Sequence, residues 1–322
     1  MIDEKNRKIL IELQRDARQA DAVIARKLGL SEAAVRRRIS RLIDEGVMRI
    51  TAVAVPWKIG LDTVAFFGIQ AEIQKLDKVM DALAKLARIH WVSFTTGRFD
   101  IMTWATFHSH HEMANYIKKE IAAIDGIRML ESMFCLEFRK RDQKILEDHQ
   151  MNDEVLKEKG GAKKSRSNKK SSRQSVMIDD RDLAIINALQ DDARQSDAQI
   201  SRQLKMSEST VRRRIQNMIQ NDVISVAAVI DPLKVGYKIV AFIHIQANLS
   251  ELDSICQRFA EMPRVHAVAF TTGWADIFLF ATFRSHKELR DFATIYIANT
   301  PGVTRTETFI SLEIKKRDLS IL

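Results

Sequence analysis

The stretch GLSEAAVRRRISRLIDEG, residues 29–46, holds three adjacent arginines inside an apolar frame. Val35, Ile39 and Leu42 follow one another at spacings of four and three, which in a helix forms one buried stripe. The arginines between them then face the other side of that helix. Because Ser31 is a favourable N-cap, the pattern predicts a short amphipathic helix with a basic outer face.

Two further helices are expected before this one. Residues 4–14 place their leucines and isoleucines on one helical face, and residues 21–28 repeat the pattern. Gly29 supplies a tight turn before the third helix. Three short helices with such a turn predict a winged helix-turn-helix domain at residues 1–56, whose third helix enters the major groove of DNA.

The same unit is written twice. The letters VRRRI at residues 35–39 return at residues 211–215, and residues 2–146 align with residues 178–322 without a gap. Such a period is far longer than that of a solenoid repeat, so each copy is a whole folding unit or more. The sequence therefore predicts a tandem duplication, with a second helix-turn-helix domain at residues 178–232.

Arginine suits contact with DNA because its guanidinium forks onto guanine O6 and N7 and also pairs with phosphates. The two copies differ where bases would be read, since Ala33 aligns with Ser209 and Arg41 aligns with Asn217. We expect two reading heads that prefer non-identical half-sites; the alternative is a solvated basic helix face. The predicted DNA contacts are Ser31, Ala33, Arg36, Arg37, Arg38 and Arg41 in the first copy and Ser207, Ser209, Thr210, Arg212, Arg213 and Arg214 in the second.

The rest of each copy has the pattern strand, helix, strand, strand, helix, strand. This order predicts an α+β fold in which a ferredoxin-like βαββαβ domain follows each head, at residues 57–146 and 233–322. Two helices would cover one face of each sheet, so the other face needs a partner sheet. Pairing is expected either within the chain, as a pseudo-dimer, or between chains, as a homo-oligomer. The elements expected in the first copy are strands at 63–73, 89–96, 99–107 and 126–138 and helices at 75–86 and 110–124.

Residues 147–177 have no counterpart in the other copy. Their stretch GGAKKSRSNKKSSRQS is rich in glycine, serine and lysine and has almost no apolar residue. Such a segment cannot bury enough surface to offset its ordering entropy, so it is interpreted as a flexible basic linker. A second interpretation is that the linker also touches DNA phosphates without sequence preference.

Composition narrows the class of protein. The formal charge of +9 favours polyanionic partners, such as double-stranded DNA or an anionic membrane surface, and does not choose between them. The two cysteines, Cys135 and Cys256, give neither a disulfide framework nor a zinc spacing. No apolar run is long enough to span a bilayer, and the charged N-terminus lacks the apolar core of a signal peptide. We expect a cytoplasmic protein with no membrane partner, no metal and no cofactor.

A helix-turn-helix followed by βαββαβ resembles the Lrp/AsnC family of transcriptional regulators. The stretches IDEKNRKILIELQRDAR, GLSEAAVRRRISRLIDEGV and PGVTRTET, and the paired TTGRFDI and TTGWADI, are similar to that family. The resemblance covers nearly all of the chain except the linker. It implies a DNA-binding domain, an amino-acid-binding domain and assembly through sheet pairing into dimers and larger rings. A usual member corresponds to one half of this chain.

The resemblance also implies where an effector binds, near the glycine-aspartate turn at the interface between paired domains. A backbone N–H at a glycine turn can hold the carboxylate of an amino acid, and an aspartate can hold its ammonium. The alternative is that Gly97 only permits the turn and Asp100 caps it. Because Arg98 of the first copy aligns with Trp274 of the second, the two pockets are not expected to be equivalent. The implied positions are Thr96, Gly97, Arg98, Asp100, Thr272, Gly273, Trp274 and Asp276.

The histidines raise an enzymatic alternative. His90 and His266 share a repeat position, as do His110 and His286, and some proteins that resemble this family are sirohaem decarboxylases. No histidine has a second ligand at metal spacing, and no catalytic triad or phosphate-binding loop stands out. A decarboxylase needs no basic reading helix, whereas this chain carries two. We therefore predict a sequence-specific transcriptional regulator and not an enzyme; the other alternative is an architectural protein that bends DNA.

Overall fold

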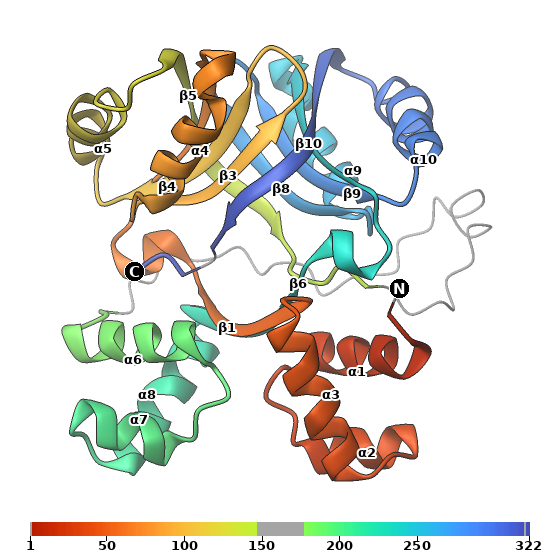
Figure 1. Ribbon diagram of the computed structural model, residues 1–322. Helices are drawn as coiled ribbons and strands as arrows, with labels where there is room; N and C mark the ends of the chain where they lie inside the picture. Colours follow the sequence, from red (N-terminus) through yellow and green to blue (C-terminus); the bar gives the residue numbers. More distant parts are fainter. Residues whose placement is uncertain (1, 147–176, 319) are drawn as a thin grey trace.

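The computed structural model describes residues 2–146, 177–318 and 320–322. These residues form a β-barrel with helices around it, and two helical heads lie side by side below the barrel (Figure 1). The predicted linker, apart from residue 177, lies outside the described residues. Among the helices that the structure describes, none is long and apolar enough to cross a membrane.

Each head contains the three helices that its sequence predicts. Ser31 and Ser207 each cap the third helix of their head by accepting a hydrogen bond, 3.2 Å long, from the backbone N–H three residues on. The turn before that helix needs a left-handed residue, and Gly29 takes φ 64° there while Lys205 takes φ 53°. The helices are α1 (Glu4–Arg15), α2 (Asp21–Leu28), α3 (Glu32–Asp44), α6 (Asp180–Asp191), α7 (Asp197–Leu204) and α8 (Glu208–Gln220).

A two-stranded sheet joins the heads. Strand β1 (Met48–Ala54) pairs antiparallel with β6 (Ile224–Ile230), and Met48 lies opposite Ile230. Ile230 packs in the apolar core of the first head, and Ala54 packs in that of the second. Each head is thus completed by a strand of the other half, which the periodicity of either copy alone does not reveal.

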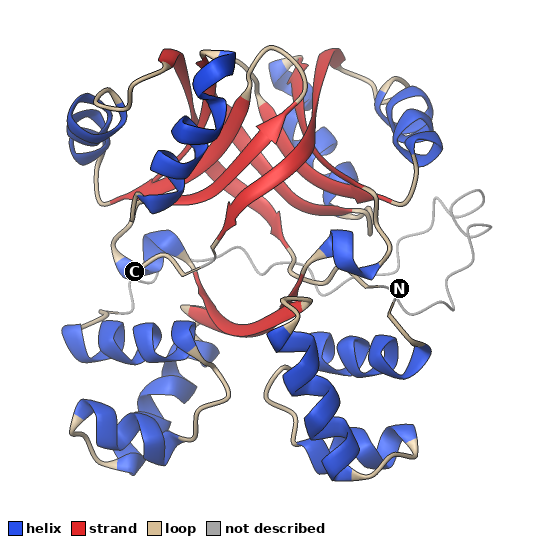
Figure 2. Cartoon of the chain, viewed as in Figure 1, coloured by secondary structure: helices blue, strands red, loops and turns tan. Residues whose placement is uncertain are grey.

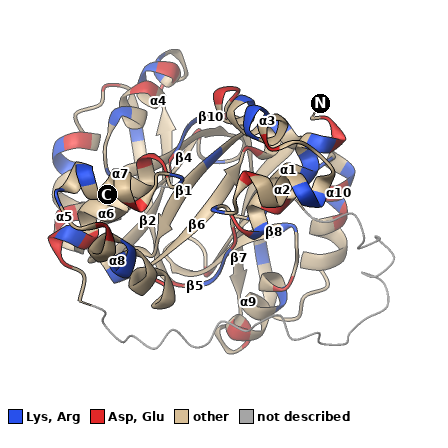
Figure 3. Cartoon of the chain, turned by 90° about the horizontal axis from the view of Figure 1, so that it is seen from below, with Lys and Arg blue, Asp and Glu red and all other residues tan. Residues whose placement is uncertain are grey.

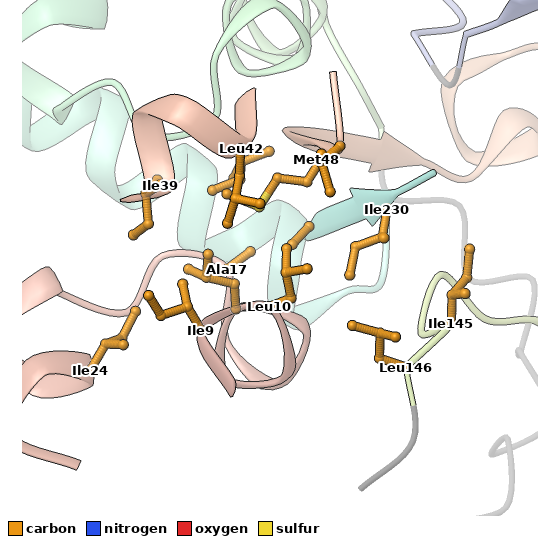
Figure 4. Close-up of a cluster of buried hydrophobic side chains, with 14 of the residues drawn as sticks. Ile9, Leu10, Ala17, Ile24, Ile39, Leu42, Met48, Ile145, Leu146 and Ile230 are labelled. Atoms are coloured by element: carbon orange, nitrogen blue, oxygen red, sulfur yellow. The ribbon is translucent and has the colours of Figure 1, made fainter. Parts of the chain in front are cut away.

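The chain also returns from the barrel to the first head. Ile145 and Leu146, which follow the last strand of the first half, pack among the helix residues of that head (Figure 4). The Tyr237 hydroxyl donates to the Ile145 carbonyl at 2.7 Å, and the Leu146 N–H donates to Gln14 Oε1 at 3.0 Å. In the second half, Ile321 packs into the core of the second head in the same way.

The ferredoxin-like order predicted for both halves is confirmed. The first half contains β2 (Thr63–Ala71), α4 (Leu76–Lys85), β3 (Ile89–Thr95), β4 (Ile101–Phe107), α5 (His110–Tyr116) and β5 (Ile127–Arg141). The second contains β7 (Ile239–Ala247), α9 (Leu252–Ala260), β8 (Val265–Thr272), β9 (Ile277–Phe283), α10 (His286–Asp291) and β10 (Val303–Arg317). Both α5 and α10 continue into a π-helical turn.

The two sheets pair within the chain. Strand β5 pairs first with β2 of its own half and then with β8, while β10 pairs with β7 and then with β3. The eight strands close a barrel in the order β10-β3-β4-β2-β5-β8-β9-β7. Aromatic and other apolar side chains from both halves pack in its interior. The helices lie outside the strands (Figure 2). Of the two pairings left open by the sequence, this is the intrachain pseudo-dimer.

Candidate DNA-binding face and ligand cavity

The third helices α3 and α8 belong to the heads, which lie on the side of the molecule below the barrel (Figure 1). Seen from that side, lysines and arginines gather on α3 and α8 (Figure 3). In the first turn of each helix, Ser31, Ala33, Ser207 and Ser209 are exposed. The three arginines of each VRRRI motif differ in their surroundings, and these differences repeat from one head to the other.

The first arginine of each motif is exposed but held by acids of its own head. Arg36 is 67% exposed, and its guanidinium contacts Glu32 at 2.6 Å and Asp21 at 3.5 Å. Arg212 contacts Glu208 at 2.5 Å and Asp197 at 3.0 Å. These contacts fix the direction of the guanidinium before any DNA arrives.

The third arginine of each motif turns back toward the first helix of its head. Arg38 contacts Asp3 at 2.7 Å and Asn6 at 2.8 Å. Arg214 contacts Asp182 at 2.8 Å, and this hydrogen bond raises the pKa of its guanidinium. Both side chains therefore anchor the third helix to the head, although the sequence grouped them with the residues that contact DNA.

The middle arginine is the one that remains open. Arg37 and Arg213 are exposed, and neither makes a hydrogen bond or ion pair with another residue that the structure describes. Arg41, one turn further on, contacts Glu45 at 2.7 Å, whereas the equivalent Asn217 accepts from the side-chain amide of Asn221 at 2.9 Å. The two reading surfaces thus share one free arginine and differ beside it.

Ion pairs that the sequence analysis missed hold the two heads together. Arg18 of the first head contacts Asp197 at 3.5 Å, and Arg194 of the second contacts Asp21 at 2.5 Å. Asp21 and Asp197 also hold the first arginine of the VRRRI motif in their own heads. The sequence signal for these ion pairs is the stretch DARQ, which precedes an Asp-Ala pair in both copies and supplies the arginine, while that pair supplies the aspartate.

The two glycine-aspartate turns are built by their own side chains. Asp100 accepts from the Ala71 N–H at 2.9 Å, and Asp276 accepts from the Ala247 N–H at 2.9 Å. Thr96 bonds to the backbone of Ile310, and Thr272 lies opposite Phe134 in the sheet. Gly97 has φ 105° and Gly273 has φ 131°, so both permit the turn. These six predicted effector residues shape the turns.

The other two predicted effector residues line one shared cavity of about 140 Å³. The Arg98 guanidinium contacts Glu307 at 3.1 Å and lies 5.5 Å from the Trp274 ring. The Trp274 Nε1–H donates to His244 at 2.8 Å, and burial lowers the pKa of His244 to about 3. The cavity therefore draws on both halves, with an arginine from one turn and a tryptophan from the other.

Family models match both parts of each copy. Residues 64–145 and 240–321 match the model of the Lrp/AsnC ligand binding domain. Residues 2–43 match that of the AsnC-type helix-turn-helix domain, and residues 178–225 match that of a winged helix-turn-helix DNA-binding domain. The two ligand-binding matches alone take up half of the chain.

Curated relatives correspond to one half of the chain. An uncharacterized HTH-type transcriptional regulator of Pyrococcus abyssi (strain GE5 / Orsay) is 40% identical over 142 residues, which are 44% of this chain and 90% of the relative. The HTH-type transcriptional regulator LrpA of Pyrococcus horikoshii is 31% identical over 138 residues, 42% of this chain and 98% of the relative.

Solved structures of the siroheme decarboxylase NirDL are similar over almost the whole chain. One of them superposes with a TM-score of 0.64 at 13% identity, covering 98% of this chain and 93% of that chain. At this identity the similarity shows that the two-headed arrangement is a shared fold, and it carries no further conclusion about chemistry.

Proposed function

Since the chain belongs to the Lrp/AsnC family and is a DNA-binding transcription regulator with two ligand-binding domains, we propose that it binds one DNA site with both heads and responds to a small zwitterionic effector. The observation that carries the proposal is the pair of exposed, unpartnered arginines. Within the described residues, Arg37 and Arg213 are the members of the two VRRRI motifs that have no partner. A guanidinium in this position is available to a guanine edge or a phosphate.

The DNA site is proposed to be asymmetric. The heads present the same scaffold, but Arg41 is replaced by Asn217 and Ala33 by Ser209. An arginine and an asparagine prefer different bases, because arginine forks onto guanine while asparagine pairs with adenine. Because both reading heads belong to one chain, this difference is fixed in every molecule.

The effector is proposed to bind in the cavity between the two glycine-aspartate turns. Arg305 is exposed beside this cavity and makes no ion pair with any described residue, so its guanidinium is available to pair with a carboxylate. Glu307 can hold an ammonium group while it contacts Arg98. Opposite charges on one small cavity support a free amino acid as the ligand class.

A location in the cytoplasm and further assembly of copies complete the proposal. The cytoplasm follows from a DNA partner and not from any targeting signal. Leu136 and Leu312, at equivalent positions of β5 and β10, are 55% and 57% exposed. Apolar residues exposed in this way support contacts between copies outside the barrel.

The test is a DNA-binding titration at two salt concentrations, on the DNA upstream of the protein's own gene and on random DNA. The account predicts clear preference for the upstream fragment and a change in affinity when a mixture of amino acids is added. Arg37→Ala combined with Arg213→Ala is expected to abolish the preference, while Lys119→Ala, an exposed cation beside the barrel, leaves it intact. Equal, salt-sensitive binding to both fragments would instead favour the architectural alternative.

The decarboxylase alternative rests on the similarity of fold to NirDL. Its test is the absorption spectrum of the protein after incubation with sirohaem. No DNA binding together with a bound and decarboxylated tetrapyrrole would replace the regulator proposal.

A further inference from the structure

A second cavity, of about 110 Å³, lies inside the barrel at the end that faces the heads. The last residues of β5 and β10 line it, and these strands end toward the heads (Figure 1). Seven of its sixteen lining residues are phenylalanine or tryptophan, and they come from both halves: Phe66, Trp91, Trp104, Phe138, Phe242, Phe278 and Phe280. It shares no residue with the cavity between the glycine-aspartate turns.

The space exists because the two halves are not identical. Trp91 fills one side of the barrel, but the equivalent position in the second half is Ala267. The Trp91 ring packs edge-on against Phe242 and Phe280, at centroid distances of 5.7 and 5.6 Å. A second tryptophan at residue 267 would occupy the region that is now open.

Two buried polar atoms around the cavity have no partner among the described residues. Trp91 Nε1 and Thr103 Oγ1 make no hydrogen bond there. Their residues are only 5% and 2% exposed, and both line the cavity. Buried polar groups are nearly always hydrogen-bonded, so these two atoms are available to a polar group in the cavity.

Two arginines add positive charge at the mouth of this cavity. Arg317 donates to the Ile230 carbonyl at 2.8 Å, and Arg141 lies 3.5 Å from the Ala54 carbonyl. Neither makes an ion pair with any residue in the described ranges. Burial lowers the pKa of both guanidinium groups to about 10, so both remain charged at neutral pH.

One acid also lies at the mouth. Asp142 lines the cavity, but its carboxylate accepts from the Lys144 N–H at 2.9 Å and forms no ion pair with either arginine among the described contacts. Asp231 also acts on Arg317 through its charge, but it does not line the cavity. The charged side chains that line the cavity are two guanidinium groups and one carboxylate, which leaves a net positive charge. A charge in a poorly solvated place needs a counter-charge, so the mouth is complementary to an anion.

We propose that this cavity binds a small aromatic carboxylate, with its ring among the aromatic side chains and its carboxylate toward Arg141 and Arg317. The cavity, about 110 Å³, is smaller than the roughly 150 Å³ apolar cavity that holds a benzene ring, so it takes at most one ring, excludes a fused system and leaves the carboxylate at the mouth. The Trp91 N–H and the Thr103 hydroxyl are donors that the carboxylate can also use.

Such a ligand would also affect the heads. Ala54 and Ile230, whose carbonyls face the two arginines, are the last residues of β1 and β6. A carboxylate that takes over the guanidinium groups releases these carbonyls, and so changes the sheet that joins the heads. This consequence rests on the proposed DNA-binding function, whereas the binding itself does not.

The test is calorimetry and tryptophan fluorescence on the full chain with three probes: phenylacetate, its neutral analogue phenylacetamide, and acetate. The proposal predicts saturable binding of phenylacetate, at least tenfold tighter than that of the other two, and a change in tryptophan emission. Equal affinity for phenylacetate and phenylacetamide, or no saturable binding of phenylacetate, overturns it.

Variants locate the site. Ala267→Trp is expected to abolish phenylacetate binding by filling the cavity. If the tryptophan variant does not fold, Ala267→Leu takes its place and is expected to weaken binding. The double variant Arg141→Gln with Arg317→Gln removes the preference for phenylacetate over phenylacetamide. Lys315→Gln, which removes a surface cation paired with Asp81, is the matched control and binds normally. Unchanged binding in a folded Ala267→Leu variant contradicts the proposal.

A DNA titration with saturating phenylacetate separates the two proposals. If the protein binds phenylacetate but prefers no DNA sequence, the ligand proposal stands and the regulator proposal falls. If it prefers its upstream DNA but binds no phenylacetate, the regulator proposal stands and the ligand proposal falls.

Discussion

The two heads are close copies of each other, whereas the two halves of the barrel interior are not. In both heads the first arginine of the motif is held by two acids, the second has no partner among the described residues and the third is anchored to the first helix. Inside the barrel, Trp91 occupies the position that Ala267 occupies in the second half, and at the glycine-aspartate turns Arg98 corresponds to Trp274. The two halves thus differ at residues that line the cavities between them and agree in the VRRRI motifs.

The physical reason lies in symmetry. In a homodimer every substitution appears twice, so a change near the two-fold axis must be tolerated on both sides. In a fused chain a bulky residue in one half can be accommodated by a small one in the other. The heads are under a different requirement, since each must present the same scaffold to the same kind of DNA groove.

The largest expected effect tests the likeness of the heads. Arg37→Ala and Arg213→Ala are each expected to cost about 1–3 kcal/mol of binding free energy on the cognate site, since each removes one base or phosphate contact. The measurement is a titration of each single variant on that site. Closely similar losses support the same role for the middle arginine in both heads, whereas a loss confined to one variant would show that a single head reads the DNA.

The next effect tests the divergence of the barrel interior. A Cβ atom on Gly68 would lie 2.4 Å from the ring of Phe99, whereas the second half has His244 and Ala275 at these positions. Gly68→Ala is therefore expected to lower the free energy of unfolding by roughly 1–3 kcal/mol through overpacking. Urea denaturation of the purified variant measures this loss.

Combining substitutions sharpens the same comparison. The pair Gly68→His with Phe99→Ala copies the second half, so its cost is expected to be smaller than the sum of the two single costs, with a coupling of about 0.5–3 kcal/mol. Gly68→Ala combined with the distant Lys119→Ala is the control and should be additive. Simple additivity in both pairs would mean that the clash at Gly68 is relieved elsewhere.

A third effect concerns the buried histidines that both halves share. Burial lowers the pKa of His90 and of His266 to about 4, and each ring bonds a threonine hydroxyl at 2.8 Å. The folded state thus binds fewer protons than the unfolded state, whose histidines titrate near pH 6.5. The contribution of each histidine to the free energy of unfolding is therefore fully present above about pH 6.5. It falls by roughly 1.4 kcal/mol per pH unit between about pH 6.5 and pH 4.

The measurement is the urea midpoint from pH 7 to pH 4.5. His90→Gln and His266→Gln are each expected to make the pH dependence shallower by a similar amount. A steep dependence that survives both substitutions would assign the loss to other groups.

The smallest effect concerns the ion pairs between the heads. Arg18→Gln with Arg194→Gln removes the contacts with Asp197 and Asp21, which are partly buried and are expected to contribute about 1 kcal/mol each, the upper end of the range for surface pairs. Stability should change little, but the variant should tolerate altered spacing between half-sites better than the native chain. A set of DNA sites with one to three inserted base pairs measures this, with Lys8→Gln as the surface control.

The sequence predicted the elements well where burial on one face imposes a period. The three helices of each head and the βαββαβ order follow from such periods, and strand 126–138 was found as β5 (Ile127–Arg141). The change of partner along β5, from β2 to β8, was not predictable, because alternation shows that a strand is buried and not against which strand it pairs.

The candidate site was predictable only in part, for a similar reason. Helical periodicity separates Val35 and Ile39 from the arginines, but it does not distinguish Arg37 from Arg38. That distinction depends on Asp3, which lies far away in the sequence and contacts Arg38 at 2.7 Å. The cavity beside Trp91 likewise depends on Ala267, and only the closed barrel brings the two positions together.

The central claim is that one chain reads one asymmetric DNA site with two similar but unequal heads. Selection of binding sites from random DNA by the full chain tests it most directly. The account predicts an enriched motif of two different half-sites, centred about one helical turn or a multiple of it apart. A perfectly palindromic motif would contradict unequal heads, and the absence of any enriched motif would contradict sequence-specific binding altogether.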